Sequence, residues 1–153
     1  MSGPLTSPAP CDDLVALLHA RGGRATPQRL VILRELRRAG QHVTAEEIGR
    51  TVRADLPGIS MPTVYATLEL LVELGLARRV DAGGAAIYDP RLEPHQHASC
   101  RRCGRLEDID CDLDSPALLD AAAAGGFVGR SVELVISGLC AGCATLARER
   151  PAG

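Results

Sequence analysis

Two Cys-x2-Cys pairs place the strongest constraint on how this chain can fold. The first pair is Cys100 and Cys103, and the second is Cys140 and Cys143. Two thiolates at this spacing can bind one ion, and two such pairs complete a tetrahedral shell of four sulfurs, which is typical of structural Zn²⁺. The alternative is a set of disulfides or a redox dithiol. Because the first residues show no secretion signal, we expect the cytoplasm, where thiols stay reduced, and therefore favour zinc.

The composition is that of a soluble globular protein. The chain has 153 residues, a net charge of −2 and 46% hydrophobic residues. Its length allows one domain or two small ones. No apolar run approaches the roughly 20 residues that cross a membrane, so we expect no membrane partner. Only Tyr65, Tyr88 and Phe127 are aromatic, so the core must consist of Leu, Val, Ile and Ala.

The first half of the chain has the pattern of a winged helix-turn-helix over residues 11–88. Helix-capping signals occur at Thr26, at Thr44 with Glu47, and at Ser60, before apolar residues at helical spacing. The last of these helices, residues 61–74, precedes two strand-like runs, residues 77–80 and 85–88. In a winged helix-turn-helix, the helix before the wing enters the major groove. A helical bundle that only buries its leucines is the alternative.

Charge is distributed unevenly along the chain. Residues 21–53 contain eight arginines and three glutamates, whereas residues 93–153 contain six arginines and nine acidic residues. A basic segment in one half of a chain fits a nucleic-acid-binding face. Solvated helix faces are the alternative explanation.

The second half predicts a small α/β domain over residues 95–153, after a proline-containing hinge over residues 89–94. Residues 1–10 are predicted to be a flexible arm. Strands are expected over residues 95–100, 106–111 and 131–139, with a helix over residues 115–124. We therefore predict an α+β protein whose second domain is a β-α-β unit. A unit this small needs a metal ion or a partner chain for stability.

Histidines and carboxylates form a second candidate metal site. His95 and His97 alternate along a predicted strand, so both imidazoles can face one ion. Asp89 lies in the hinge and Asp108 on the next strand. Imidazoles with carboxylates suit Fe²⁺, Mn²⁺ or Zn²⁺. The two remaining cysteines, Cys11 and Cys111, are interpreted as inert thiols, with oxidation as the alternative.

Five segments in this order resemble the ferric uptake regulator family: TPQR, HVTAEEI, SMPTVYATL, HQHASCRRCG and LCAGC. The resemblance covers about residues 12–145. It implies a dimeric, metal-dependent transcriptional repressor with an N-terminal winged helix and a C-terminal dimerisation domain. It also implies a double-stranded DNA operator, expected to be an A/T-rich palindrome.

The resemblance further implies a regulatory ion, Fe²⁺ or Mn²⁺. Its ligands fall on His42, Asp89, His95, His97 and Asp108. Because His42 belongs to the DNA-binding half, one ion would fix the two domains in the DNA-binding arrangement. Asp89 and Asp108 resemble the peroxide-sensing members, in which Fe²⁺ reduces peroxide, a ligating histidine is oxidised and DNA is released; iron-uptake members more often have glutamate at the position of Asp108. The alternative is a regulator that senses only the availability of iron, or of zinc, nickel or manganese.

Three residues are implied to contact DNA. Arg24 matches a basic residue that reaches a narrow minor groove. Thr63 and Tyr65 lie on the recognition helix, where Tyr65 can contact a thymine methyl group. A half-buried core aromatic is the alternative for Tyr65. Two positions depart from the family pattern: Ala66 replaces a frequent arginine or asparagine, and residues 127–132 lack the histidine of an additional metal site.

Two other classes of function are alternatives to a repressor. The first is a metalloenzyme that uses the histidines and aspartates, but the sequence offers no evident general base or oxyanion donor. The second is a zinc-stabilised interaction module that does not bind DNA. We therefore predict a repressor and no enzymatic activity.

Overall fold

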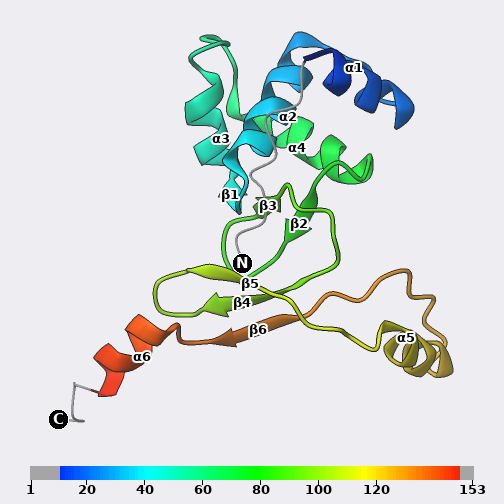
Figure 1. Ribbon diagram of the computed structural model, residues 1–153, viewed down its shortest axis with the longest axis vertical. Helices are drawn as coiled ribbons and strands as arrows, with labels where there is room; N and C mark the ends of the chain where they lie inside the picture. Colours follow the sequence, from blue (N-terminus) through cyan, green and yellow to red (C-terminus); the bar gives the residue numbers. More distant parts are fainter. Residues whose placement is uncertain (1–10, 149–153) are drawn as a thin grey trace. The chain divides into compact units, whose positions relative to one another are not determined.

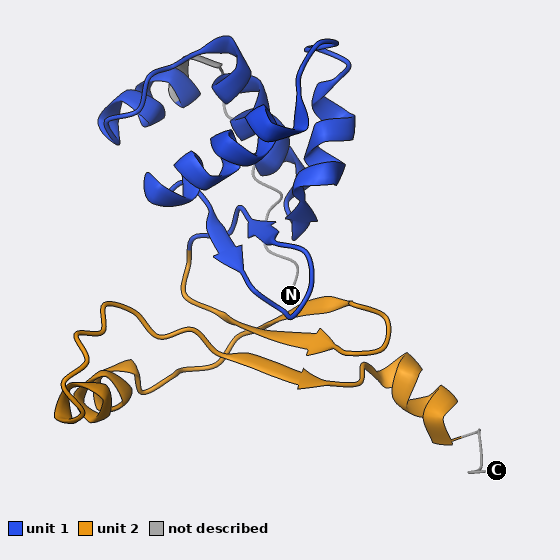
Figure 2. Cartoon of the chain, turned by 180° about the vertical axis from the view of Figure 1, so that it is seen from behind, with its two compact units in different colours: residues 1–92 blue, residues 93–153 orange. Residues whose placement is uncertain are grey.

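The computed structural model describes residues 11–148 and divides the chain into two compact units, residues 1–92 and 93–153 (Figures 1 and 2). The predicted arm over residues 1–10 lies outside the described part. No helix within residues 11–148 is both long and apolar enough to cross a membrane.

The first unit contains four helices and three short strands, in the order α1 (Cys11–Ala20), α2 (Pro27–Ala39), β1 (Val43–Thr44), α3 (Ala45–Val52), α4 (Met61–Glu73), β2 (Arg78–Val80) and β3 (Ile87–Asp89). Three helix starts confirm the predicted caps. The side chains of Thr26 and Ser60 accept hydrogen bonds from backbone N–H groups three residues on, and Thr44 forms a complete capping box with Glu47.

The strands of this unit form an antiparallel sheet in the order β1-β3-β2. The hairpin of β2 and β3 was predicted. Strand β1 was missed because it has only two residues and Thr44 also caps α3.

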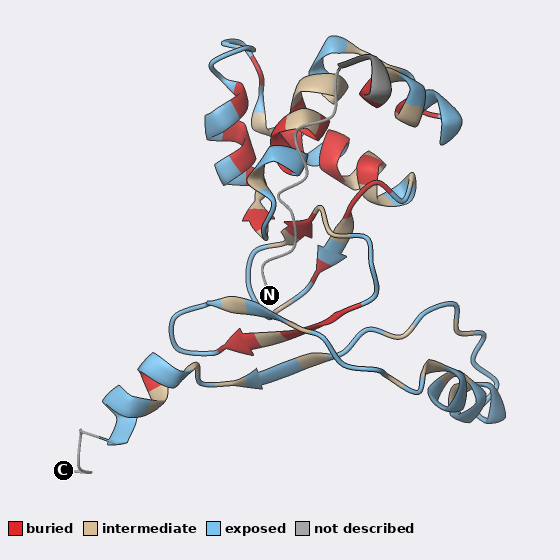
Figure 3. Cartoon of the chain, viewed as in Figure 1, coloured by how far each residue is buried: buried red, intermediate tan, exposed pale blue. Residues whose placement is uncertain are grey.

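The hydrophobic core of this unit joins all four helices to the sheet. Leucine, isoleucine and valine side chains fill it, together with the fully buried ring of Tyr88. Figure 3 shows that buried positions recur along the described parts of these helices. Close packing brings α3 to the start of α4: a Cβ on Gly49 would lie 2.6 Å from the sulfur of Met61. Gly49 therefore allows the two helices to approach each other.

The second unit contains three strands and two helices, in the order β4 (Gln96–Cys100), β5 (Leu106–Ile109), α5 (Ser115–Ala124), β6 (Val135–Gly138) and α6 (Ala141–Arg148). Its sheet has the order β5-β4-β6, with β5 antiparallel and β6 parallel to the central strand. The helix α5 was predicted with these bounds. The strands are shorter than predicted, and α6 was not predicted.

The predicted β-α-β unit needs one correction. The strands on either side of α5 are not neighbours, because β4 lies between β5 and β6.

Few apolar side chains are buried in the second unit. The helix α5 contains no buried residue, and Phe127 and Val128 are 68% and 89% exposed. Leu118, Ile136 and Leu146 are also exposed. The buried residues from His95 to Cys143 are mostly polar or cysteine. Hydrophobic burial within this unit therefore contributes little stability.

Candidate metal centres and nucleic-acid interface

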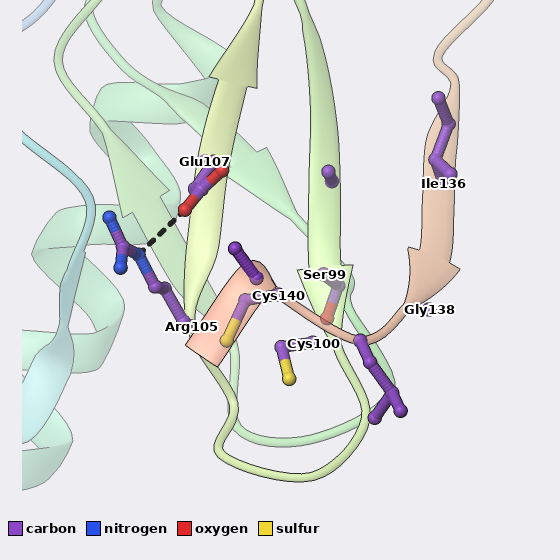
Figure 4. Close-up of a pocket in the computed structure, with 10 residues that line it drawn as sticks. Ser99, Cys100, Arg105, Glu107, Ile136, Gly138 and Cys140 are labelled. Carbon is purple, nitrogen blue, oxygen red and sulfur yellow. Dashed lines mark ion pairs between the residues drawn. The ribbon is translucent and has the colours of Figure 1, made fainter. Parts of the chain in front are cut away.

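The four cysteines converge at one end of the second unit's sheet. Cys100 ends β4, Cys103 lies in the turn that follows, Cys140 precedes α6, and Cys143 lies in the first turn of α6. Gly104 closes the turn with a φ of 75°, and its N–H donates to the Cys100 carbonyl at 2.8 Å. Figure 4 shows Cys100 and Cys140 at this end of the sheet.

The geometry of the four sulfurs fits a tetrahedral zinc ion. All four Sγ atoms lie within 4.8 Å of one another, and those of Cys103 and Cys140 are 3.8 Å apart. Zn–S bonds of about 2.3 Å in a tetrahedron place two sulfurs about 3.8 Å apart. Because these four cysteines are free thiols, the disulfide alternative is not supported in this structure.

The thiol pKa values of Cys100 and Cys143 are shifted in opposite directions. Backbone N–H groups of Cys140 and Cys103 donate to the sulfur of Cys100 and lower the pKa of this thiol to about 6. Burial and the neighbouring cysteines raise the pKa of Cys143 to about 12. A divalent ion at this position would displace the thiol protons and offset the repulsion between the resulting thiolates, so metal binding releases protons.

A cavity of about 210 Å³ adjoins the cysteine cluster (Figure 4). Ala98 and Ile136 contribute apolar lining, while Arg105 and Glu107 form an ion pair at 2.7 Å.

His42 and Asp89 meet across the sheet of the first unit. The register pairs Val43 with Tyr88, so His42, directly before β1, lies opposite Asp89 at the end of β3. The Nε2 atom of His42 is 3.6 Å from Oδ2 of Asp89. The other carboxylate oxygen accepts a hydrogen bond from the N–H of Arg91 at 2.8 Å, which orients the carboxylate.

His95, His97 and Asp108 meet on the sheet of the second unit. His97 is in register with Asp108 on the neighbouring strand. The Oδ1 atom of Asp108 is 3.5 Å from Nε2 of His95 and 3.9 Å from Nε2 of His97. Two ligands of a tetrahedral ion, each about 2.1 Å from it, are about 3.4 Å apart, so these distances are close to those of atoms that share one ion.

The tautomer of His95 also suits metal binding. Its Nδ1 atom lies 2.7 Å from the backbone carbonyl oxygen of Glu93, which can only accept a hydrogen bond, so Nδ1 carries the proton. A backbone partner of this kind fixes the ring and leaves the Nε2 lone pair available as a ligand. The donor atoms of both groups are nitrogen and oxygen, which suit divalent ions such as Fe²⁺, Mn²⁺ and Zn²⁺.

The residues predicted to contact DNA lie at exposed or half-buried positions of the first unit. Arg24 is exposed before α2, and its carbonyl oxygen accepts from Nη1 of Arg29 at 3.1 Å. Thr63 lies in the first turn of α4, with its hydroxyl 2.9 Å from that of Ser60. Tyr65 is 36% exposed, so it does not belong to the core. A groove of about 430 Å³ runs between the starts of α2 and α4, and the small side chain of Ala66 helps to line it.

Two glutamates next to these residues were not identified from the sequence. Glu46 on α3 accepts a hydrogen bond from the hydroxyl of Tyr65 at 2.5 Å. Glu69 on α4 accepts from the hydroxyl of Tyr88 at 2.6 Å and from Arg79 at 3.2 Å. Both contacts join elements that are distant in sequence, so no local motif signals them.

Known proteins match this chain over most of its length. The model of the ferric uptake regulator family matches residues 20–136. The transcriptional regulator FurA of Mycobacterium tuberculosis (strain ATCC 25618 / H37Rv) is 35% identical over 133 residues, which cover 86% of this chain and 90% of FurA. The peroxide-responsive repressor PerR of Staphylococcus aureus (strain NCTC 8325 / PS 47) is 34% identical over 99 residues, which cover 64% of this chain and 67% of PerR.

A solved structure extends this likeness to the fold. A zinc uptake regulator complexed with zinc and DNA is similar with a TM-score of 0.67 and 25% identity, covering 92% of this chain and 99% of that chain.

Proposed function

The chain belongs to the ferric uptake regulator family and is a metal-responsive transcriptional regulator, and we propose that it is a repressor that senses peroxide through its regulatory metal site. The observation that carries this proposal is the position of the Asp108 carboxylate. This carboxylate, on a side chain shorter than that of glutamate, faces the imidazoles of both His95 and His97, so all the candidate ligand atoms are nitrogen or oxygen. The similarity to the peroxide-responsive repressor of Staphylococcus aureus supports it.

The regulatory ion is proposed to join ligands from both units. His42 and Asp89 would supply one part of its shell, and His95, His97 and Asp108 the other. A bound ion would then restrict how the units move relative to each other, and the restricted arrangement is the one that binds DNA. Fe²⁺ and Mn²⁺ both suit this donor set.

The oxidation step changes an imidazole. Fe²⁺ held at this site would activate hydrogen peroxide without a net change in its own oxidation state. The O–O bond of peroxide would break, one oxygen atom would be added to a ring carbon of His42 or His95, and the other would leave as water; the two electrons that reduce the peroxide would come from the imidazole. The oxidised ring is a poorer ligand, so the ion and then the DNA are released.

Zinc and dimerisation are assigned to the second unit. The similar zinc uptake regulator binds zinc and DNA, and we assign dimerisation of this chain to its second unit. We assign structural Zn²⁺ to Cys100, Cys103, Cys140 and Cys143. The exposed side chains of Phe127, Val128 and Ile136 support burial against a second copy of the chain, because the unit lacks a core of its own.

DNA binding is assigned to the first unit. The recognition helix is proposed to be α4, with Thr63 and Tyr65 in the major groove and Arg24 in an adjacent minor groove of an A/T-rich palindromic operator.

Mass spectrometry after peroxide treatment tests this proposal. In the iron-loaded protein, we expect a gain of one oxygen atom on the peptide that contains His42 or His95. The manganese-loaded protein is the control and should stay unmodified, because Mn²⁺ does not readily reduce peroxide. If every histidine of the iron form remains unmodified, the peroxide assignment is wrong. Modification of only Cys11 or Cys111 would instead indicate a thiol switch.

The variant Asp108→Glu tests the role of the carboxylate. One additional methylene group displaces the oxygen that faces both imidazoles and fills space beside the ion. We expect metal-dependent DNA binding to persist while histidine oxidation slows by about tenfold, which corresponds to roughly 1.4 kcal/mol in the barrier. Asp110→Glu makes the same change two residues away and should oxidise like the parent. An unchanged rate in Asp108→Glu would remove this carboxylate from the oxidation mechanism.

Sensing of metal availability alone is the second candidate function. It is favoured by the 35% identity to FurA, which extends over more of the chain than the match to the peroxide-responsive repressor. DNA binding that follows the concentration of free Fe²⁺ but survives peroxide would establish this alternative.

A further inference from the structure

The contact between Glu46 and Tyr65 joins α3 to the exposed side of α4. The hydroxyl of Tyr65 lies 2.5 Å from Oε1 of Glu46. One turn later on α3 and one turn earlier on α4, Gly49 packs against Met61. This close packing fixes the distance between the two helices, so Glu46 and Tyr65 are held within hydrogen-bonding reach.

The direction of this hydrogen bond is determined by chemistry. The hydrogen bond from Tyr65 lowers the pKa of Glu46, and Arg50 on the next turn adds to this effect, so the side chain is a carboxylate at neutral pH. The same bond raises the pKa of Tyr65, which therefore keeps its proton. A carboxylate has no hydrogen to donate, so the hydroxyl must be the donor. The lone pairs of the tyrosine oxygen remain available, and this oxygen can then only accept.

We propose that Glu46 is a specificity-determining residue, which holds the Tyr65 hydroxyl as a hydrogen-bond acceptor toward the DNA. In the major groove, adenine and cytosine present amino donors, whereas guanine and thymine present oxygen acceptors at the corresponding positions. The Tyr65 hydroxyl would therefore select adenine or cytosine at the base whose amino group it reaches, while the ring can contact a thymine methyl group at another base. The inference rests on the proposed role of α4 as the recognition helix.

The surroundings of Tyr65 favour this assignment. In the first two turns of α4, the partly or fully exposed side chains up to residue 66 are Met61, Pro62, Thr63, Tyr65 and Ala66, and Met61 packs against Gly49. Pro62 and Ala66 have no polar side-chain atom, and the Thr63 hydroxyl lies 2.9 Å from that of Ser60. Among these side chains, Tyr65 has the polar group whose role is set by another helix: Glu46 on α3 makes the Tyr65 hydroxyl a donor to α3, so toward the DNA its oxygen can only accept.

Base analogues test the inference directly. A preferred duplex is first selected from a random pool with the Mn²⁺-loaded protein. Each adenine or cytosine of one half-site is then replaced by an analogue without the exocyclic amino group, namely purine or 2-pyrimidinone deoxyriboside. We expect the affinity of the parent protein to fall about three- to tenfold at one position, the effect of one hydrogen bond. The analogue also removes one hydrogen bond of the base pair. Because this change to the duplex is the same for every variant, it cancels when the variants are compared.

Two variants assign this loss to the proposed pair. Tyr65→Phe keeps the ring but lacks the oxygen, so the same analogue should cost it no affinity. Glu46→Gln carries an amide that can donate to the tyrosine oxygen, so the hydroxyl can also donate to a base. That variant should tolerate guanine or thymine at the position, with its base preference reduced about three- to tenfold. Glu73→Gln makes the same charge change at the exposed end of α4 and should retain the parent's preference.

The outcomes separate this inference from the proposed function. If Tyr65→Phe loses as much affinity as the parent on the analogue duplex, another residue accepts the hydrogen bond and the inference is wrong. If the analogue duplex costs the parent and Tyr65→Phe affinity but costs Glu46→Gln none, the Glu46 carboxylate itself accepts the hydrogen bond from the base, and the inference is also wrong. A parent protein that selects no duplex overturns the proposed function as well as this inference. Unfolding curves of each variant identify any loss of fold.

Discussion

The imidazole of His97 shows how one residue can be tested apart from the fold. It lies on the central strand of the second unit and faces Asp108, while the cysteine cluster begins three residues later. We expect His97→Ala to retain the zinc and the circular dichroism spectrum of the parent but to lose Mn²⁺-activated DNA binding by at least tenfold, because the shell loses a ligand. DNA titrations with and without Mn²⁺ measure this effect.

The control for His97→Ala is a histidine outside both ligand sets. His19 is exposed in the last turn of α1, so His19→Ala should bind metal and DNA like the parent. Full Mn²⁺ activation of His97→Ala would remove His97 from the ligand set.

At the scale of the element, Tyr88 connects the wing to α4. Its ring is fully buried, and its hydroxyl donates to Glu69 at 2.6 Å. Burial, followed by the hydrogen bond to Glu69, raises the pKa of this hydroxyl. Removal of the hydroxyl in Tyr88→Phe should lower the free energy of unfolding of the first unit by about 1 kcal/mol, because one hydrogen bond is lost while the ring still fills the core.

Urea unfolding monitored by circular dichroism checks this value. Tyr65→Phe is the matched control, since its hydroxyl bonds to Glu46 at the surface and its loss should change stability by less than about 0.5 kcal/mol. Equal stability of Tyr88→Phe and the parent would contradict a role of this contact in joining β3 to α4.

Elements with local signals were predictable, whereas contacts between elements were not. Three helix starts could be predicted from the capping residues Thr26, Thr44 and Ser60, because a cap involves only residues within one turn. The helix α6 has no comparable capping signal, and the two residues of β1 are too few for an alternating pattern. The pairing of His97 with Asp108 follows from strand register, which a sequence does not display locally.

The candidate site illustrates the same limit. The spacing of the cysteines predicted four ligands that the structure brings together. The alternation of His95 and His97 predicted that both imidazoles can face one ion. The hydrogen bonds of Glu46 and Glu69 instead depend on how α3, α4 and the β2–β3 hairpin pack in the first unit.

For the whole molecule, the two units differ in what stabilises them. The first unit has a continuous core of leucine, isoleucine and valine, whereas α5 of the second unit buries no residue. A unit that buries little apolar surface obtains its folding free energy from metal binding and association. Loss of zinc should therefore affect the second unit selectively.

Replacement of Cys103 by serine tests this dependence. A shell with three sulfurs binds Zn²⁺ much more weakly, and the turn after β4 and the start of α6 are then no longer held together. We expect Cys103→Ser to lose zinc and to become monomeric in analytical ultracentrifugation, while amides of α2 and α4 stay protected from hydrogen exchange. Cys111→Ser is the matched control, because Cys111 is exposed and outside the cluster, and it should remain a zinc-bound dimer. If Cys103→Ser is a dimer without zinc, the ion does not stabilise the second unit, and the exposed apolar surface around Phe127 must be sufficient for association.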